Sequence, residues 1–371
     1  MKPLICGLVL SVVVATAIGQ GPLKVPAKGA GGETLVTLHL KDAYPDDAII
    51  KIHDQTQVDF NAVPEDLWDK IDKKVTVDAE GKPLLAVLWE ICAQSNVAFR
   101  TSPFERSIEL IPASGNLAGR PICAAGPLLF VPETMVRSQS ITYSAERRRQ
   151  DGCTIQLAIY QEPGLNVIAL GSGLDISEAV DENGHSLLPT GPKRAGAAPV
   201  LTRGSAYSQA SVQLALGENA GRTVKSLKGT YTVVLPTQTR QTQFDDVMSG
   251  KELTETLGDF AITIKAQPGD ARTMGLRITA APAKDVMIKG GDPRWNLLTN
   301  ALSNAHFVDA KGHSTRSWGI GITSNAATYQ ADITFPPAGA AGGNGRKLVV
   351  DLPIASKELS LPFAFKDLPL P

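Results

Sequence analysis

Two pairs of aspartate and histidine residues have a spacing that is compatible with metal binding. Asp181 precedes His185 by four positions, and Asp309 precedes His313 by the same interval. Imidazole and carboxylate groups both bind divalent ions, but each pair offers two ligands, whereas a metal site needs three or four that converge. We therefore interpret both pairs as exposed turn residues, and the sequence predicts no metal centre. The remaining histidines belong to no ligand motif: His39, His53 and His306.

Residues that could support hydrolysis or nucleotide binding occur without the partners that such chemistry requires. The Gly-Ser-Gly segment 171–173 is not a G-x-S-x-G nucleophile elbow. The glycine-rich segment 339–345 lacks the Lys-Ser/Thr pair of a phosphate-binding loop. A glycosidase needs two carboxylates across a cleft, and the sequence leaves open whether distant acids meet in this way. It thus predicts no catalytic residue and no cofactor.

The cysteines bear on the redox compartment. Cys6 lies in an apolar leader, so export would leave three cysteines. Cys92 falls on the apolar face of a helical run, where we expect a buried free thiol. Cys123 and Cys153 each precede an expected strand, and they form a candidate disulfide in an oxidising compartment. The sequence does not decide between a bridge and two thiols, because it gives no Cα separation.

The charge balance disfavours a polyanionic partner. The chain has 36 basic and 37 acidic residues and a net charge of −1, which gives no electrostatic reason to expect nucleic acid. One basic cluster, Arg147-Arg148-Arg149, lies beside Asp151-Gly152. This pattern is typical of a solvated hairpin tip, and a site for an acidic partner is the alternative.

The first residues have the features of an export signal. Lys2 precedes an apolar run that ends in small residues, so we expect a signal peptide over residues 1–19. An uncleaved membrane anchor is the alternative, but the run is short for a bilayer. Residues 20–33 are rich in Gly, Pro, Lys and Ala, which predicts a flexible linker. No later stretch is long and apolar enough to span a membrane, so we expect an exported protein, periplasmic or extracellular.

The segment 35–100 contains nearly the same pattern twice. In each copy an alternating strand precedes a helical run, and a short strand ends the copy at Phe60 or Phe99. Helix starts are indicated by Pro45 with two aspartates in the first copy and by Pro83 in the second. Residues 64–69, between the copies, are expected to form one helical turn, and a partner-binding loop is the alternative. The matching residues lie 39 positions apart: Ile49 and Leu88, Ile52 and Ile91, Gln55 and Gln94, Val58 and Val97.

This region resembles a known family. The pattern V-T-L-x-L-K-D-A-x-x-x-D-A-I-x-x-I-x-x-Q-T at 36–56, followed by K-V-T-V and a second helix, is similar to the secretin and TonB short N-terminal (STN) domain. The resemblance covers residues 34–112 and implies a small duplicated βαβ module that makes protein–protein contacts in the periplasm. The chain lacks the long series of amphipathic strands that membrane-embedded members carry, so we expect the module in a soluble protein.

The rest of the chain has the pattern of β-sandwiches. Short alternating or apolar runs follow one another between turn residues, and they predict one sandwich over 113–240 and a second over 241–371. A weak sequence similarity between Val180–Ser186 and Val308–Ser314 suggests that the two predicted sandwiches are related. The predicted fold class is α+β. The expected strands are 128–131, 138–143, 154–160, 166–170, 211–216 and 230–235, then 260–266, 275–280, 318–323, 329–335, 347–352 and 359–365.

Two functions remain from the sequence. The first is a non-enzymatic interaction or structural protein of the bacterial envelope, in which the STN-like module docks to another envelope protein. The second is an exported hydrolase or carbohydrate-binding protein with a site in the sandwich loops at 189–205 or 336–346. Aromatic residues make up 5% of the chain and few lie in those loops, which disfavours a sugar-stacking surface. We therefore expect the first function.

Overall fold

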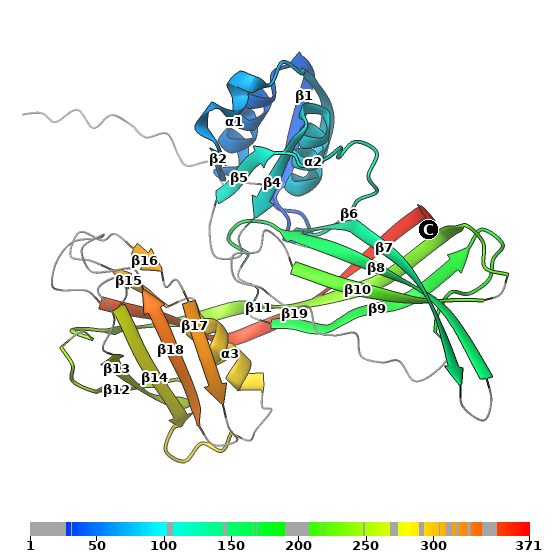
Figure 1. Ribbon diagram of the computed structural model, residues 1–371. Helices are drawn as coiled ribbons and strands as arrows, with labels where there is room; N and C mark the ends of the chain where they lie inside the picture. Colours follow the sequence, from blue (N-terminus) through cyan, green and yellow to red (C-terminus); the bar gives the residue numbers. More distant parts are fainter. Residues whose placement is uncertain are drawn as a thin grey trace, which may run out of the picture.

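The chain is mainly β structure, with helices concentrated in a small N-terminal unit (Figure 1). Its structure is a computed structural model that describes residues 27–30, 32–101, 107–143, 147–165, 167, 169–189, 208–217, 219–247, 249–267, 274–288, 293–303, 305–308, 314–316, 319–324, 328–335 and 347–371. The expected signal peptide, 1–19, and the linker up to 26 lie outside these residues. Within them, no helix has the length and apolar character needed to cross a bilayer.

The N-terminal unit follows the order strand–helix–strand twice. β1 pairs antiparallel with β3, while β5 lies between β2, to which it is parallel, and β4, to which it is antiparallel. Both helices and the single turn between the copies occur where the sequence predicts them. The elements are β1 (Leu35–Ala43), α1 (Pro45–Thr56), β2 (Asp59–Ala62), the 3-10 helix η1 (Glu65–Lys70), β3 (Val75–Pro83), α2 (Leu84–Ser95), β4 (Val97–Thr101) and β5 (Ser107–Pro112).

The helices of this unit bury side chains on two faces, because a small sheet lies on either side of them. One core joins Ile52 and Ile91 to the β1–β3 pair. The other joins Leu88 and Trp89 to β2, β4 and β5. The hydrogen bonds also recur along the chain. Gln55 bonds both the N–H and the C=O of Thr37, and 39 positions later Gln94 bonds the same two groups of Thr76.

Two sheets enclose the next core. The first sheet has the order β10-β8-β7-β6 and the second the order β16-β15-β19-β11-β9. Phe130 of the first sheet stacks on Phe363 of the second at 5.2 Å between ring centroids. The strands are β6 (Cys123–Ala125), β7 (Leu128–Tyr143), β8 (Arg147–Gln161), β9 (Ala169–Asp181), β10 (Ser208–Leu216), β11 (Thr223–Phe244), β15 (His306–Val308), β16 (Ser314–Arg316) and β19 (Lys347–Pro369).

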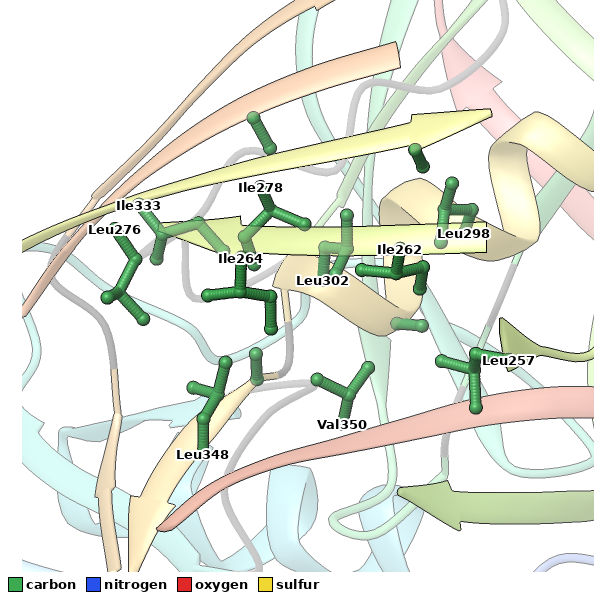
Figure 2. Close-up of a cluster of buried hydrophobic side chains, with 14 of the residues drawn as sticks. Leu257, Ile262, Ile264, Leu276, Ile278, Leu298, Leu302, Ile333, Leu348 and Val350 are labelled. Carbon is green, nitrogen blue, oxygen red and sulfur yellow. The ribbon is translucent and has the colours of Figure 1, made fainter. Parts of the chain in front are cut away.

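A third sheet, of order β12-β13-β14-β18-β17, forms the other large core together with a helix. Figure 2 shows Leu298 and Leu302 of that helix among Ile262, Ile278 and other sheet residues. This helix is not among the elements predicted from the sequence, although Pro293 and the spacing of Leu298, Ala301 and Leu302 are helix signals. The elements are β12 (Leu253–Leu257), β13 (Phe260–Gln267), β14 (Met274–Pro282), α3 (Pro293–Ser303), β17 (Gly319–Ser324) and β18 (Tyr329–Phe335).

The strands β11 and β19 run through both large cores, which differs from the expected domain boundary at 240/241. They pair antiparallel from Thr223–Pro369 to Phe244–Leu348. Leu361 and Phe363 belong to the core of the first sandwich, whereas Leu348 and Val350 belong to that of the second. The sequence predicts two strands of one domain at 347–352 and 359–365. In the structure both segments belong to one strand, β19, which contributes side chains to both large cores.

The N-terminal unit packs on the outer face of the first sandwich. Along β7 the residues Leu128 to Val131 are buried on both faces: Leu128 and Phe130 point to the sandwich core, while Leu129 and Val131 contact the N-terminal unit. Tyr160 of β8 completes the contact, with its ring 5.0 Å from Phe99 and 6.4 Å from Trp89. This apolar contact holds the unit against β7 and β8.

A buried carboxylate joins the same two parts. Glu162, which follows β8, accepts the N–H of Thr34 at 2.9 and 3.0 Å and the Thr34 hydroxyl at 2.8 Å. Burial raises the pKa of Glu162, and the Thr34 donors and nearby Lys28 oppose that rise. Backbone hydrogen bonds within 27–35 fold the end of the expected linker into a turn before β1. The attachment is therefore polar as well as apolar.

Candidate functional site

A groove opens on the side of the N-terminal unit between α1 and β2. It encloses a pocket of about 460 Å³. Helix α1 contributes one wall and the edge strand β2 the other, with one residue of β5 at the end. The lining residues are Ile49, Ile50, His53, Asp59, Phe60, Asn61 and Ser107. An apolar floor with polar groups at its border is typical of a binding surface.

Ile50 is the apolar residue that solvent reaches most in this groove. The buried stripe of α1 consists of Ala48, Ile49 and Ile52, and Ile50 lies outside it with 56% of its surface exposed. A large apolar side chain outside the core stripe does not stabilise the fold by burial. When it borders a pocket, it is a candidate contact for a partner.

His53 has a fixed orientation at the groove. Its Nδ1 lies 2.8 Å from the carbonyl oxygen of Val58, which can only accept a hydrogen bond, so Nδ1 carries the proton. In the neutral ring Nε2 is then an acceptor. The carboxylate of Asp59 lies 3.8 Å from Nδ1. His53 can therefore receive a hydrogen bond from a hydroxyl or an N–H group of a ligand.

Acidic residues surround Ile50. Asp46, Asp47 and Asp54 occupy the positions three or four residues away on α1, which makes them its neighbours on the helix surface. Asp59 adds a fourth carboxylate from β2, with 72% of its side chain exposed. Of these four carboxylates, Asp59 lines the pocket itself and the other three flank Ile50 along α1, so the groove and the adjoining helix surface suit a partner that carries basic residues.

Strand β2 is also an edge strand. It pairs with β5 on one side, and the sheet order β2-β5-β4 places it at the border. An edge strand presents N–H and C=O groups with which an extended segment can pair. The chemistry of the groove is therefore that of binding: apolar contact, backbone pairing and attraction of positive charge.

The structure places the Asp181–His185 pair in a turn, as the sequence predicts, but Asp181 is buried and not exposed as expected, because its carboxylate holds backbone N–H groups of the turn and of a neighbouring loop. The buried Asp181 carboxylate accepts backbone N–H groups from Asn183, His185 and Gly221 at 2.8 to 2.9 Å, and His185 Nδ1 lies 3.2 Å away. Asp181 thus fastens the 217–223 loop to the end of β9. Asp309 and His313 lie outside the described residues. In the described part of the chain, no three His, Cys, Asp or Glu side chains gather as a metal site.

Acid should loosen this turn. Burial alone would raise the pKa of Asp181, but the N–H donors of Gly221, His185 and Asn183 outweigh it and lower the pKa to about 2. A carboxyl group with a lowered pKa stabilises the fold above its unfolded pKa, and that contribution is lost as the pH falls from about 4 to about 2. We expect Asp181→Asn to lower the midpoint of urea unfolding at neutral pH. The variant should also lose less stability than the wild-type chain as the pH falls from about 4 to about 2. Asp54→Asn, an exposed control, should leave both unchanged.

Of the two alternatives for Cys123 and Cys153, the structure has two free thiols and not the candidate disulfide. Cys123 pairs with Phe130 of β7 and Cys153 with Arg137, seven positions further along. At the rise of a β-strand this separates the cysteines by roughly 20 Å, whereas a disulfide needs Cα atoms within about 7 Å. The two thiols lie at different levels of one sheet. Cys92 is a buried free thiol, as predicted.

The groove residues were not identified from the sequence. His53 belongs to no ligand motif, and neither Ile50 nor Asp59 is part of a catalytic or metal-binding pattern. A usable signal was present, because Ile50 is an isoleucine outside the buried stripe of its helix. The contribution of β2 carries no such signal, since its edge position follows from pairing with residues of β5 that lie 48 positions further along the chain. Arg147-Arg148-Arg149 begins β8 and pairs with the end of β7.

Comparison of the chain with protein-family models, curated proteins and solved structures gave no match. The geometry of the groove is therefore the basis on which a function is assigned.

Proposed function

We propose that this chain is an exported, non-enzymatic interaction protein of the bacterial envelope. Its N-terminal unit, a duplicated STN-like module, docks to another envelope protein, and the two β-sandwiches carry it. The observation that supports this most is the groove between α1 and β2, where exposed Ile50 and the free edge of β2 adjoin one pocket. The sandwich packs on Trp89 of α2 and Phe99 of β4, and the lining of the groove comes from α1, β2 and β5 instead.

The fixed attachment of the module supports this role. Trp89, Phe99 and Tyr160 pack together, and Thr34 bonds Glu162, so the groove is held in one orientation relative to the sandwich. A pre-organised surface loses less conformational entropy when it binds than a mobile one. The alternative, a hydrolase or carbohydrate-binding protein, places its site in loops whose residues 190–207 and 336–346 lie outside the described part of the chain.

The test is affinity capture with the full chain immobilised and an extract of bacterial envelope proteins in solution. Ile50→Glu adds a fourth negative charge to this surface of α1 and removes the exposed isoleucine, so it should reduce capture of the specific partner by about tenfold or more. Ile354→Glu is the matched control, because Ile354 is a similarly exposed isoleucine, at 52%, on β19. Equal capture by both variants, or binding of a glycan that neither variant alters, would contradict the proposal.

A further inference from the structure

The contact between the N-terminal unit and the first sandwich contains two carboxyl groups and one ammonium group. Glu162 lies on the sandwich side and is 4% exposed. Glu33 and Lys28 lie on residues 27–34, which precede β1 and which we call the latch segment. In the described part of the chain, these two are the charged groups that act on Glu162. The side chains that β7 and β8 present to the unit are otherwise apolar or aromatic: Leu129, Val131, Ala158 and Tyr160.

Hydrogen bonds from the latch segment converge on the Glu162 carboxylate. The backbone of the segment folds back as a hairpin, in which Lys28 lies opposite Thr34. The Lys28 ammonium donates to Thr34 Oγ1 at 2.7 Å, and the Thr34 hydroxyl donates to Glu162 Oε2 at 2.8 Å. The Thr34 N–H donates to both oxygens of the same carboxylate, at 2.9 and 3.0 Å. Closure of the segment on the sandwich therefore depends on the state of one carboxyl group.

Negative charge exceeds positive charge at this contact. The Lys28 ammonium lies 3.9 Å from Glu162 Oε2, and 53% of the lysine side chain is exposed, so water screens its charge. Oε2 of Glu33 is buried and has no hydrogen-bond partner among the described residues. A buried carboxylate oxygen without a donor destabilises the state that buries it. One bound proton would remove one of the two negative charges.

Opening of the latch segment removes the causes of this excess. Glu162 then becomes hydrated, and the Glu33 carboxylate moves away together with the segment. Burial raises the pKa of Glu162 most and the charge of Glu33 adds to the rise, whereas the Thr34 donors and Lys28 oppose it. A carboxyl group that is buried beside a like charge holds its proton more tightly than a hydrated one. The closed contact therefore has a higher proton affinity than the open one.

We propose that this contact is a proton-linked latch, in which Glu162 takes up a proton from solvent as residues 27–34 close on it. Proton binding and closure then favour each other. The protonated group keeps its carbonyl oxygen for the Thr34 N–H, and its O–H donates to the Thr34 hydroxyl, which retains the bond from Lys28. Because Thr34 leads directly into β1, the latch acts on the attachment of the whole N-terminal unit.

The direction of the pH effect follows from this linkage. A carboxyl group with a raised pKa in the closed state stabilises closure fully below its pKa in the open state, whose ordinary value is 4.5. That contribution is lost as the pH rises through the higher pKa of the closed state. Acid therefore closes the latch, whereas a carboxylate that served only as a hydrogen-bond acceptor would be released by acid.

Hydrogen exchange of the Thr34 amide in the full chain tests the proposal. Its protection, corrected for the intrinsic exchange rate, should fall by about threefold or more between about pH 4.5 and about pH 8, because the latch opens more often. The Thr76 amide donates to Gln94 within the unit and should keep its protection. Constant or rising protection of Thr34 over this range would overturn the proposal.

Substitution of the carboxyl groups separates a proton-linked latch from a fixed contact. Glu162→Gln is uncharged at every pH and retains an oxygen for the Thr34 N–H, so the Thr34 amide should stay as protected at pH 8 as in the wild-type chain at low pH. Glu33→Gln removes the neighbouring charge and should reduce the loss of protection. Glu358→Gln, at an exposed position of β19, is the matched control and should leave the profile unchanged.

Two results with Glu162→Gln would contradict the latch. Weaker protection of Thr34 at neutral pH would show that the ionised carboxylate is needed as an acceptor. A pH dependence that persists in this variant would come from another group, such as His39, which is bonded to Asp78 and Glu80. Neither result bears on the proposed function, because capture of a partner through Ile50 uses the groove and not the latch segment.

Discussion

Truncation of the chain after Ser356 will unfold the first sandwich, although that sandwich begins far earlier in the sequence. The removed part of β19 pairs with β11 from Thr223 to Leu235 and contributes four buried apolar side chains, Leu361, Phe363, Phe365 and Leu368. Each such side chain stabilises the fold by about 1.5–3 kcal/mol. Their sum is comparable to the whole stability of a domain, about 5–15 kcal/mol.

A single substitution at the same place gives a graded measurement. Phe363 is 3% exposed and stacks on Phe130, so Phe363→Ala should lower the free energy of unfolding by about 3–5 kcal/mol. Urea denaturation followed by far-ultraviolet circular dichroism measures the loss. Lys366→Ala, on the solvent side of the same strand, is the control. If Phe363→Ala spared the first sandwich and weakened only the second, the shared strand would be disproved.

Gly229 of β11 offers an independent check on this packing. A Cβ atom at Gly229 would lie 2.7 Å from the Asp175 carbonyl oxygen of β9 and 2.7 Å from the Phe363 ring. Glycine is therefore required here by the close approach of a neighbouring strand and an aromatic ring, not by the backbone angles. Gly229→Ala should destabilise the first sandwich, and the added presence of Phe363→Ala should reduce that effect by relieving one of the two contacts.

Trp89→Ala will loosen the N-terminal unit from the first sandwich. Trp89 is 6% exposed and contacts both Phe99 and Tyr160, so its truncation should cost about 3–5 kcal/mol of stability. A double-mutant cycle with Tyr160→Ala should give a coupling of about 0.5–1.5 kcal/mol, as is usual for aromatic pairs. Tyr143→Ala, which removes an exposed tyrosine from the same ladder, is the matched control.

Hydrogen exchange separates undocking from unfolding in these variants. The amide of Thr34 donates to Glu162 across the contact, whereas the amide of Thr76 donates to Gln94 within the unit. If Trp89→Ala releases an intact unit, exchange of the Thr34 amide accelerates while that of Thr76 stays slow. Equal acceleration of both would mean that the unit unfolds as it leaves. Either outcome bears on function, because a released unit no longer holds its groove in one orientation.

Several local features could be predicted because short-range patterns govern them. Proline and aspartates at 45–47 specify the start of α1, and Gln55 and Gln94 recur in the positions where each bonds a strand backbone. The apolar run of residues 128–131 indicates a strand buried on both faces. Part of the expected strand at 166–170 lies outside the described residues, and the described strand β9 runs over Ala169–Asp181. Apolar residues alone do not show where pairing begins.

The continuous course of β19 could not be predicted in the same way. Residues 353–358 are Pro-Ile-Ala-Ser-Lys-Glu, which do not continue the apolar alternation on either side, so the sequence pattern predicts two separate strands. The opposing stretch of β11 around Pro236 has register shifts at the same level. Proline removes ladder hydrogen bonds and is tolerated at such irregularities. The two ends of β19 pack into two different hydrophobic cores. Those cores are built from distant parts of the chain, so the local sequence does not show that the strand is continuous.

The sequence by itself determined the alternating strands, the two helices of the N-terminal unit and their 39-residue repeat, because each depends on neighbours within a few positions. Only the tertiary structure decided which half of that repeat is covered and which is open. Trp89, Cys92 and Phe99 are buried because β7 and β8 pack on them, and Ile50, His53 and Phe60 line a groove because no described part of the chain does so there. Burial depends on which distant surfaces meet, and a local pattern does not contain that information.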